Sequence, residues 1–355
     1  MKSFFEHLAK KIEPAVGGQV CFTARLFGGN VFHFHLPKAW PVDGMRRSLF
    51  NECDGQESGA GRAWHIYGAC LTRQALAELT APFNRNAFGL LSQPGVTGTP
   101  AELGPFAFYD SQYGCLRAYD FERQVAYIVH APDHQFFEWE VFSPFKEFWH
   151  YWTLYRGGLM LHSAVICKDD RALVLLGAGG AGKSTTTLTC VACGMRTAGD
   201  DFNVLLIDDR GIFAYPLFTS LKMKGDNPFS AQLPQLKTWQ QQSYANCEKT
   251  IYFPRVDDTI WQQKAAQVYG LLMPIFASSL STRSQAPKEI QALTASGVSS
   301  VLHHPYMSQL FLVRLRYLHA HLPCHQLILG SDIVENAGRV EILFQNQAEN
   351  RYANS

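Results

Sequence analysis

The first part of the chain alternates hydrophobic and polar residues in short runs, the period expected of half-buried strands. Two pairs of such runs flank short polar turns: residues 19–27 and 31–36 around 28–30, and residues 116–121 and 124–130 around 122–123. Strands joined by tight turns predict a small α+β domain over residues 1–143, which we expect to recognise a substrate or partner. Its sequence shows no constellation of residues with an evident chemistry.

The hydrophobic period then changes. Residues 144–156 place five aromatic side chains at helical spacing, which predicts an amphipathic helix with a core-facing aromatic side. The apolar runs 159–166 and 172–176 predict buried strands, and residues 185–194, closed by a glycine, predict a helix. This pattern indicates an α/β domain with a mixed sheet over residues 144–345, followed by a flexible tail at 346–355.

The loop between the second of these strands and the helix reads GAGGAGKS at residues 177–184, and it fills every fixed position of a P-loop. Glycine-rich backbone lets amide groups wrap a polyphosphate, and the helix N-terminus adds partial positive charge. Lys183 is expected to reach the outer phosphates and the Ser184 hydroxyl to bind Mg²⁺. The phosphate-binding residues predicted are Gly177, Gly179, Gly180, Ala181, Gly182, Lys183, Ser184 and Thr185. The sequence therefore predicts binding of a nucleoside triphosphate, ATP with Mg²⁺.

Composition narrows the class of protein. The chain has 355 residues, 47% of them hydrophobic and 17% charged, so it can bury a substantial core. A net charge of +1 gives no support for general binding to nucleic acid or to an acidic membrane. No apolar run approaches the roughly 18 residues of a membrane span, and the nine scattered cysteines favour reduced thiols in a cytoplasm.

Two acidic pairs compete as partners of the P-loop. Asp200-Asp201 follows a helix–glycine–strand return, which brings it back beside the loop, where one carboxylate can bind metal and the other accept a proton. Asp208-Asp209 ends an apolar strand, as in a conventional hydrolytic ATPase, but it precedes Arg210-Gly211 and is better interpreted as a hairpin turn. His162, on the preceding strand, is expected to orient Asp200 or to couple with its charge.

A more specific resemblance rests on three segments: LHSAV at 161–165, the P-loop through Thr185, and GDD at 199–201. With the late segment 322–333, they resemble the HPr kinase/phosphorylase family in order and spacing. The resemblance implies a catalytic domain with the fold of phosphoenolpyruvate carboxykinases. It also implies that Asp200 is the base toward a serine hydroxyl, that Asp201 helps bind metal, and that His162 neighbours the base. Family members assemble as hexamers, which leaves a homo-oligomer open here.

The sequence departs from the family after the acidic pair. Where the family has Glu-Ile-Arg-Gly, this chain has Lys222-Met223-Lys224-Gly225. Lysine keeps the positive charge but loses bidentate phosphate geometry, and the glutamate is missing. Lys222 and Lys224 remain candidates to stabilise transition-state charge. These departures weaken any assignment of HPr itself as substrate, or of phosphorolysis.

The function predicted is a Mg-ATP-dependent kinase that transfers the γ-phosphoryl group to a hydroxyl, with a serine of a protein or peptide as the favoured acceptor. A sugar or metabolite hydroxyl is the first alternative, and a nucleotide-binding switch without transfer is the second. A phosphoenolpyruvate carboxykinase-type activity is disfavoured because the chain is short and shows no evident lysine–histidine constellation for a second metal.

Overall fold

The computed structural model describes the chain with gaps. The described residues are 2–16, 21–50, 63–81, 84–85, 90–92, 106–110, 113–224, 227, 229–243, 249–255, 258–276 and 305–352. The chain divides into two compact units, Met1–Arg156 with Val301–Leu310, and Gly157–Ser300 with Phe311–Ser355. The aromatic helix after residue 143 thus belongs to the first unit, whereas the sequence analysis placed it in the second.

The first unit is built on a mixed sheet of eight described strands, in the order β1-β2-β3-β8-β7-β6-β5-β4. The strands are β1 (Phe22–Leu26), β2 (Asn30–His35), β3 (Trp64–Cys70), β4 (Asn84–Arg85), β5 (Leu90–Ser92), β6 (Phe106–Asp110), β7 (Cys115–Asp120) and β8 (Val125–His130). Both predicted hairpins are confirmed, because β1 pairs with β2 and β7 with β8 in antiparallel register. Strand β3 is parallel to both β2 and β8.

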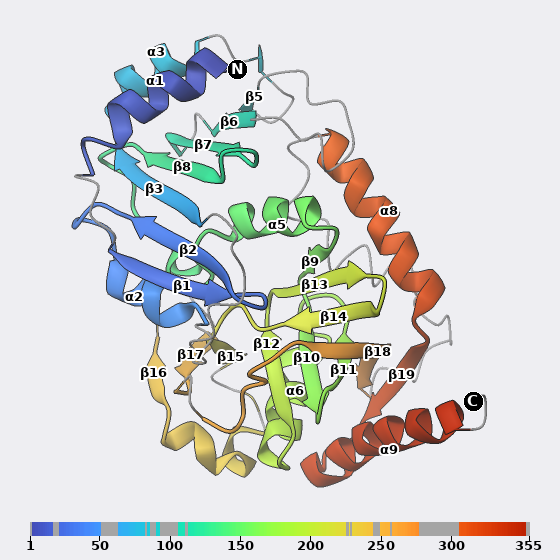
Figure 1. Ribbon diagram of the computed structural model, residues 1–355. Coiled ribbons are helices and arrows are strands. Elements are labelled where there is room, and N and C mark those ends of the chain that lie inside the picture. Colours follow the sequence, from blue (N-terminus) through green and yellow to red (C-terminus); the bar gives the residue numbers. More distant parts are fainter. Residues whose placement is uncertain are drawn as a thin grey trace. The chain divides into compact units, whose positions relative to one another are not determined.

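Helices cover the faces of this sheet (Figure 1). They are α1 (Lys2–Ile12), α2 (Val42–Ser48), α3 (Arg73–Thr80), α4 (Glu138–Phe142) and α5 (Lys146–Tyr155). Helices α1 and α3 bury Phe5, Leu8 and Leu76 against one face. Helix α5 supplies the aromatic core of the other face, where Trp152 stacks on Phe27 with ring centroids 4.6 Å apart. The predicted aromatic helix is therefore confirmed as a core element.

The second unit has its own mixed sheet, in the order β12-β10-β11-β18-β14-β13-β9, with β19 paired to β18. Its strands are β9 (Leu159–Leu161), β10 (Ala164–Lys168), β11 (Arg171–Leu175), β12 (Arg196–Asp200), β13 (Asn203–Asp208), β14 (Gly211–Tyr215), β18 (Ala266–Phe276) and β19 (Cys324–Leu329). A smaller sheet joins β15 (Leu221–Lys224), β17 (Lys249–Phe253) and β16 (Gln240–Gln242). The expectation of an α/β fold with mixed sheets agrees with this architecture.

Two helices of the second unit share a buried cluster with its large sheet. Helix α6 (Lys183–Ala192) contributes Cys190, and α9 (Ile333–Tyr352) contributes Ala337, Val340 and Phe344. Helix α9 continues to Tyr352, so most of the predicted tail is helical. The remaining elements are helix α8 (Pro305–His321) and the short 3₁₀ turns Ser230–Gln232 and Pro234–Lys237.

The predicted strand 159–166 is in fact two strands, β9 and β10, with His162 and Ser163 between them. Strand β9 pairs with β13 and β10 pairs with β12, both antiparallel, and Ala164 and Val165 keep the register of β9 before the β10–β12 pairing shifts by one residue. The two pairs therefore form one ladder that is interrupted at His162 and Ser163. At the interruption Asp201 has a φ of +86°, and the Asn203 amide donates to the Ser163 carbonyl at 2.7 Å. Because of this local departure from β geometry, His162 and Asp201 lie outside the regular strand pairing.

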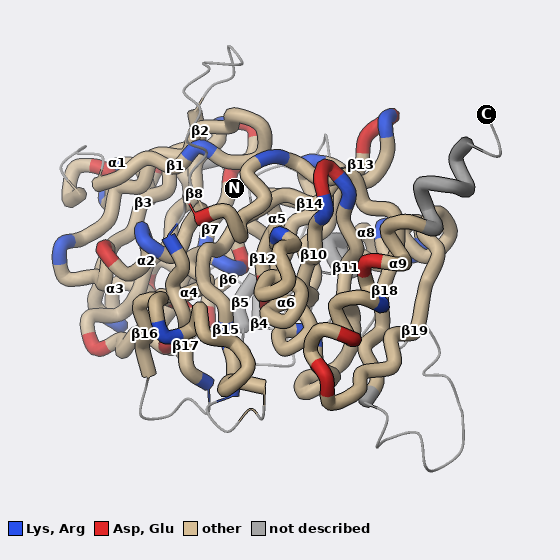
Figure 2. The backbone as a smooth tube through the Cα atoms, turned by 90° about the horizontal axis from the view of Figure 1, so that it is seen from below, with Lys and Arg blue, Asp and Glu red and all other residues tan. Residues whose placement is uncertain are grey.

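Acidic and basic positions are interspersed along the described backbone of each unit rather than gathered in one segment of a single sign (Figure 2). This distribution agrees with the near-zero net charge. Among the helices that the structure describes, none combines the length and the apolar character needed to cross a membrane.

Candidate active site

The predicted phosphate-binding and acidic residues line one cavity of about 250 Å³ in the second unit. Its walls are residues 179–185 of the P-loop and α6, together with His162, Asp200, Asp201, Lys222, Met223, Lys224, Asn227 and Lys249. Gly177 was predicted as well but does not line the cavity, although its carbonyl accepts a hydrogen bond from the P-loop lysine. Segments distant in the sequence therefore meet at the N-terminus of α6.

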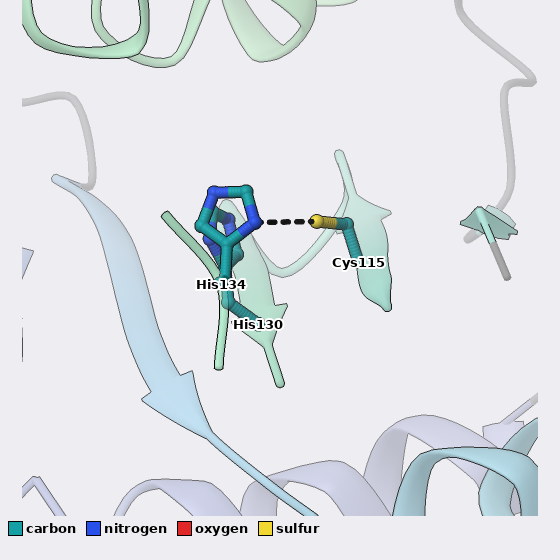
Figure 3. Close-up of side chains that lie close together, drawn as sticks. All are labelled: Cys115, His130 and His134. Carbon is teal, nitrogen blue, oxygen red and sulfur yellow. Dashed lines mark hydrogen bonds between the residues drawn. The ribbon is translucent and has the colours of Figure 1, made fainter. Parts of the chain in front are cut away.

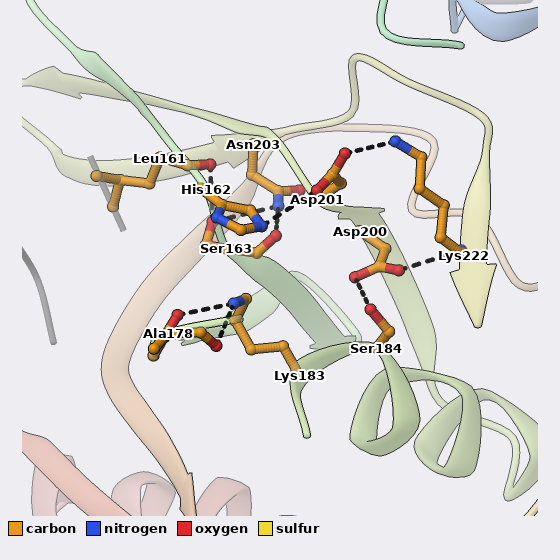
Figure 4. Close-up of polar contacts among 11 residues, drawn as sticks. Leu161, His162, Ser163, Ala178, Lys183, Ser184, Asp200, Asp201, Asn203 and Lys222 are labelled. Carbon is orange, nitrogen blue, oxygen red and sulfur yellow. Dashed lines mark hydrogen bonds and ion pairs between the residues drawn. The ribbon is translucent and has the colours of Figure 1, made fainter. Parts of the chain in front are cut away.

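The P-loop adopts a conformation that requires glycine. Gly180 and Gly182 have φ angles of +83° and +99°, a region that side chains with a Cβ disfavour. The Lys183 ammonium donates to the carbonyl of Gly177 at 2.7 Å and to that of Ala178 at 3.3 Å (Figure 4). Burial lowers the pKa of Lys183. The loop thus holds its only lysine close to its own backbone.

Asp200 is 2% exposed and lies beside the first turn of α6. The Ser184 hydroxyl donates to one of its carboxylate oxygens at 3.0 Å, and the Lys222 backbone amide donates to the other at 3.3 Å. Burial, followed by the charge of Asp201, raises the pKa of Asp200. A serine hydroxyl and two carboxylates form an all-oxygen donor set, the kind that Mg²⁺ prefers.

Asp201 lies in a different environment. Its carboxylate accepts from His162 Nε2 at 3.1 Å and from Lys222 Nζ at 2.5 Å (Figure 4). Burial raises the pKa of Asp201, but the Lys222 charge and the His162 hydrogen bond outweigh it, so the pKa lies well below its usual range. The two adjacent carboxyls are therefore shifted in opposite directions.

These contacts correct one expectation. His162 was expected to orient Asp200, but it contacts Asp201, because the interrupted ladder places both residues outside regular pairing. Lys222, on β15, contacts the same carboxylate, a shared contact that the sequence analysis did not anticipate. Lys222 and His162 are far apart in the sequence, so no local spacing revealed the arrangement.

Two lysines and an asparagine also line the cavity. Lys224 lies on β15, directly opposite Lys249 on β17, and both line the cavity. The Asn227 amide donates to the Thr185 hydroxyl at 2.9 Å. Sequence analysis named Lys224 but missed Lys249 and Asn227, since only the pairing of β15 with β17 brings Lys249 near. Gly225, which completes the segment compared with the family, lies outside the described residues.

The competing acidic pair lies elsewhere. Asp208 is paired with Gly211 across the β13–β14 turn, and its carboxylate contacts Arg210 at 2.6 Å. It is exposed and does not line the cavity. The interpretation of residues 208–211 as a hairpin turn is confirmed.

Comparison with known proteins adds little to this geometry. Nothing among protein-family models or curated proteins matches the chain. Among solved structures, it is similar to the HPr(Ser) kinase/phosphatase from Coxiella burnetii, with a TM-score of 0.22 and 10% identity. That match covers 36% of this chain and 71% of the other. We rest no conclusion on a likeness this low, and the assignment below depends on the residues of the site.

Proposed function

We propose that the second unit binds ATP with Mg²⁺ and transfers the γ-phosphoryl group to a hydroxyl, with a serine of a protein or peptide as the favoured acceptor. The observation that carries the proposal is the composition of one cavity. A P-loop lysine and serine face two adjacent carboxylates whose pKa values are shifted in opposite directions. Such a pair allows a proton acceptor and an ionised carboxylate to work side by side.

Phosphoryl transfer asks the protein mainly to position groups and to balance charge. The backbone amides of the P-loop and the N-terminus of α6 would hold the phosphates. Lys183 would exchange its loop carbonyls for phosphate oxygens, which are stronger partners because they are charged. Lys224 and Lys249, across the cavity, would offset the charge that develops on the transferred group.

The oxygen donors of the cavity suit Mg²⁺. Ser184 and Asp201 are the residues we assign to the metal, with Asp200 adjacent to both. When bound, the ion would neutralise charge on the phosphate oxygens. His162 and Lys222 then have a positioning role, since they fix the orientation of Asp201 and keep it ionised.

Asp200 is the residue we assign as base. Its buried carboxylate, with a raised pKa, is the better proton acceptor of the pair. In the proposed step the acceptor oxygen forms a bond to the γ-phosphorus while the bond between that phosphorus and the ADP oxygen breaks. The hydroxyl proton passes to Asp200, and ADP leaves.

The experiment is transfer of labelled phosphate from γ-labelled ATP with Mg²⁺ to the fractions of an extract from the source organism, with wild type and Asp200→Asn in parallel. Label that appears in a protein fraction with wild type alone supports the proposal, and label in a small-molecule fraction changes the acceptor class. Tight ATP binding without any labelled acceptor would contradict the kinase assignment in favour of a nucleotide switch.

A further inference from the structure

A second cluster of chemically active side chains lies in the first unit, where the sequence analysis found none. Cys115 begins β7 and His130 ends β8, and the two are direct partners in the antiparallel pair. His134 follows one turn later, and the Cys115 thiol lies 3.7 Å from its Nδ1 (Figure 3). The sulfur and one ring nitrogen from each histidine all lie within 4.8 Å of one another.

These separations suit a single metal ion. With a metal–sulfur bond of about 2.3 Å and a metal–nitrogen bond of about 2.0–2.1 Å, two ligands of a tetrahedral zinc lie about 3.6 Å apart. The distance between Cys115 Sγ and His134 Nδ1 is close to that value.

His130 supplies an independent indication. Its side chain is 2% exposed, and its Nδ1 is buried without a hydrogen-bond partner. Leaving a buried polar atom unsatisfied costs about 1–3 kcal/mol, so such an atom calls for an explanation. A ligand in the cluster provides one.

Glu140 orients His134 toward the other two residues. Its carboxylate oxygen accepts from His134 Nε2 at 2.9 Å and from the Phe137 amide at 2.9 Å. With the proton on Nε2, the lone pair of Nδ1 faces the Cys115 sulfur. This carboxylate–histidine arrangement is the one that commonly supports metal-binding histidines.

Glu140 is itself held by a group of largely buried charged side chains. Arg117 lies 3.9 Å from Glu140 and 3.7 Å from Glu147. Arg117 and Glu147 thus help to fix the position of the carboxylate that orients His134.

We propose that Cys115, His130 and His134 bind one thiophilic divalent cation, for which zinc has the best-matched chemistry. A thiolate with two imidazoles favours zinc over Mg²⁺, so this site is chemically distinct from the ATP cavity. Three protein ligands leave the fourth position of a tetrahedral zinc site for a water or another small ligand. The ion would fasten the end of the β7–β8 hairpin to the segment that leads into α4.

The test uses the full chain, freed of metal with a chelator and titrated with Co²⁺ as a spectroscopic substitute for zinc. We expect one equivalent to produce a thiolate-to-cobalt charge-transfer band, which zinc then abolishes by displacement. Cys115→Ser should lose the band, and Cys193→Ser, which changes an exposed thiol of the second unit, should keep it. Glu140→Gln should weaken zinc binding about 10- to 100-fold, as loss of an orienting carboxylate does elsewhere.

A wild-type protein that gives no thiolate–cobalt band would overturn the proposal without reference to any variant. An unchanged band in Cys115→Ser would overturn it as well. If Cys115→Ser does not fold, His134→Gln provides the second route, because it keeps the thiol and removes one imidazole. Zinc affinity equal to that of wild type in folded His134→Gln would also contradict the site.

Discussion

At the scale of single residues, Asp200 and Asp201 are adjacent in sequence but their carboxylates accept from different groups. Asp200 accepts from the Ser184 hydroxyl and a backbone amide, whereas Asp201 accepts from a histidine and a lysine. Burial raises the pKa of both carboxyls, but for Asp201 the Lys222 charge and the His162 hydrogen bond outweigh it, so the two pKa values shift in opposite directions. Neighbouring carboxylates can thus hold different roles, and substitution should separate them.

Asp200→Asn is expected to slow phosphoryl transfer by about 10²- to 10⁴-fold, the contribution of a general base, without changing the Mg²⁺ concentration that supports half-maximal rate. Asp201→Asn is expected to raise that Mg²⁺ concentration, because it removes an assigned ligand. The measurement is the transfer rate as a function of Mg²⁺ for both variants. A shifted Mg²⁺ dependence in Asp200→Asn would instead make Asp200, with Ser184, the metal ligand.

Lys183→Met should weaken ATP binding about 10- to 100-fold, since it removes a charged hydrogen-bond donor worth about 1.5–3 kcal/mol. Lys237→Met is the matched control, because Lys237 is exposed and lies outside the lining of the cavity. Calorimetric titration with ATP and Mg²⁺ measures both. Equal ATP affinities in the two variants would show that Lys183 does not bind the phosphates.

At the scale of elements, the interrupted ladder formed by β9–β10 and β12–β13 positions the acidic pair. Ser163 donates its backbone amide to the Asp201 carbonyl at 3.1 Å, and Asn203 donates to the Ser163 carbonyl at 2.7 Å. These bonds replace regular pairing where His162 and Asp201 leave the sheet. The geometry of the site therefore depends on Asn203, a buried residue that does not line the cavity.

Asn203→Ala should destabilise the second unit by about 1–3 kcal/mol, because it leaves the buried Ser163 carbonyl without its donor. Transfer activity should fall in parallel, because the backbone that positions Asp201 is no longer fixed by this hydrogen bond. Denaturant unfolding and the transfer assay give the two readouts, and Asp209→Asn, at an exposed turn between β13 and β14, serves as control. If Asn203→Ala is as stable and active as that control, the interrupted ladder does not depend on the Asn203 side chain.

The sequence could predict the local elements of the site but not the contacts between distant ones. The P-loop is a local motif, so its residues and the helix that follows were accessible directly. The contact of His162 with Asp201 and the placement of Lys249 depend on pairing between distant strands, which local patterns do not reveal. One signal was overlooked: the predicted 122–123 hairpin already places Cys115 opposite His130.

At the scale of the whole molecule, each unit has its own sheet and its own buried core, so the two can respond differently to pH. In the first unit His150, on α5, is 1% exposed. Burial, helped by the charge of Lys146, lowers the pKa of His150 to about 3. Between these two pKa values, His150 is protonated in the unfolded chain, where its pKa is near the usual 6.5, and neutral in the folded unit.

Because only the unfolded chain gains this proton, the free energy of unfolding falls progressively as the pH falls from about 6.5 to about 3. The loss should reach at most about 1.4 kcal/mol per pH unit for one group. Thermal unfolding at pH 7 and pH 4 should show a smaller acid shift for His150→Leu than for wild type. Equal acid shifts in the two proteins would contradict the assignment of His150 as a buried neutral base.

The most direct test of the account is loss of the γ-phosphoryl group from ATP in the presence of the acceptor fraction, measured for Asp200→Asn and Asp208→Asn side by side. The cavity geometry predicts that Asp200→Asn slows transfer about 10²- to 10⁴-fold while still binding ATP, and that Asp208→Asn, in the exposed β13–β14 turn, retains the wild-type rate. Full activity of Asp200→Asn with loss in Asp208→Asn would place the chemistry at the other acidic pair and refute the assignment.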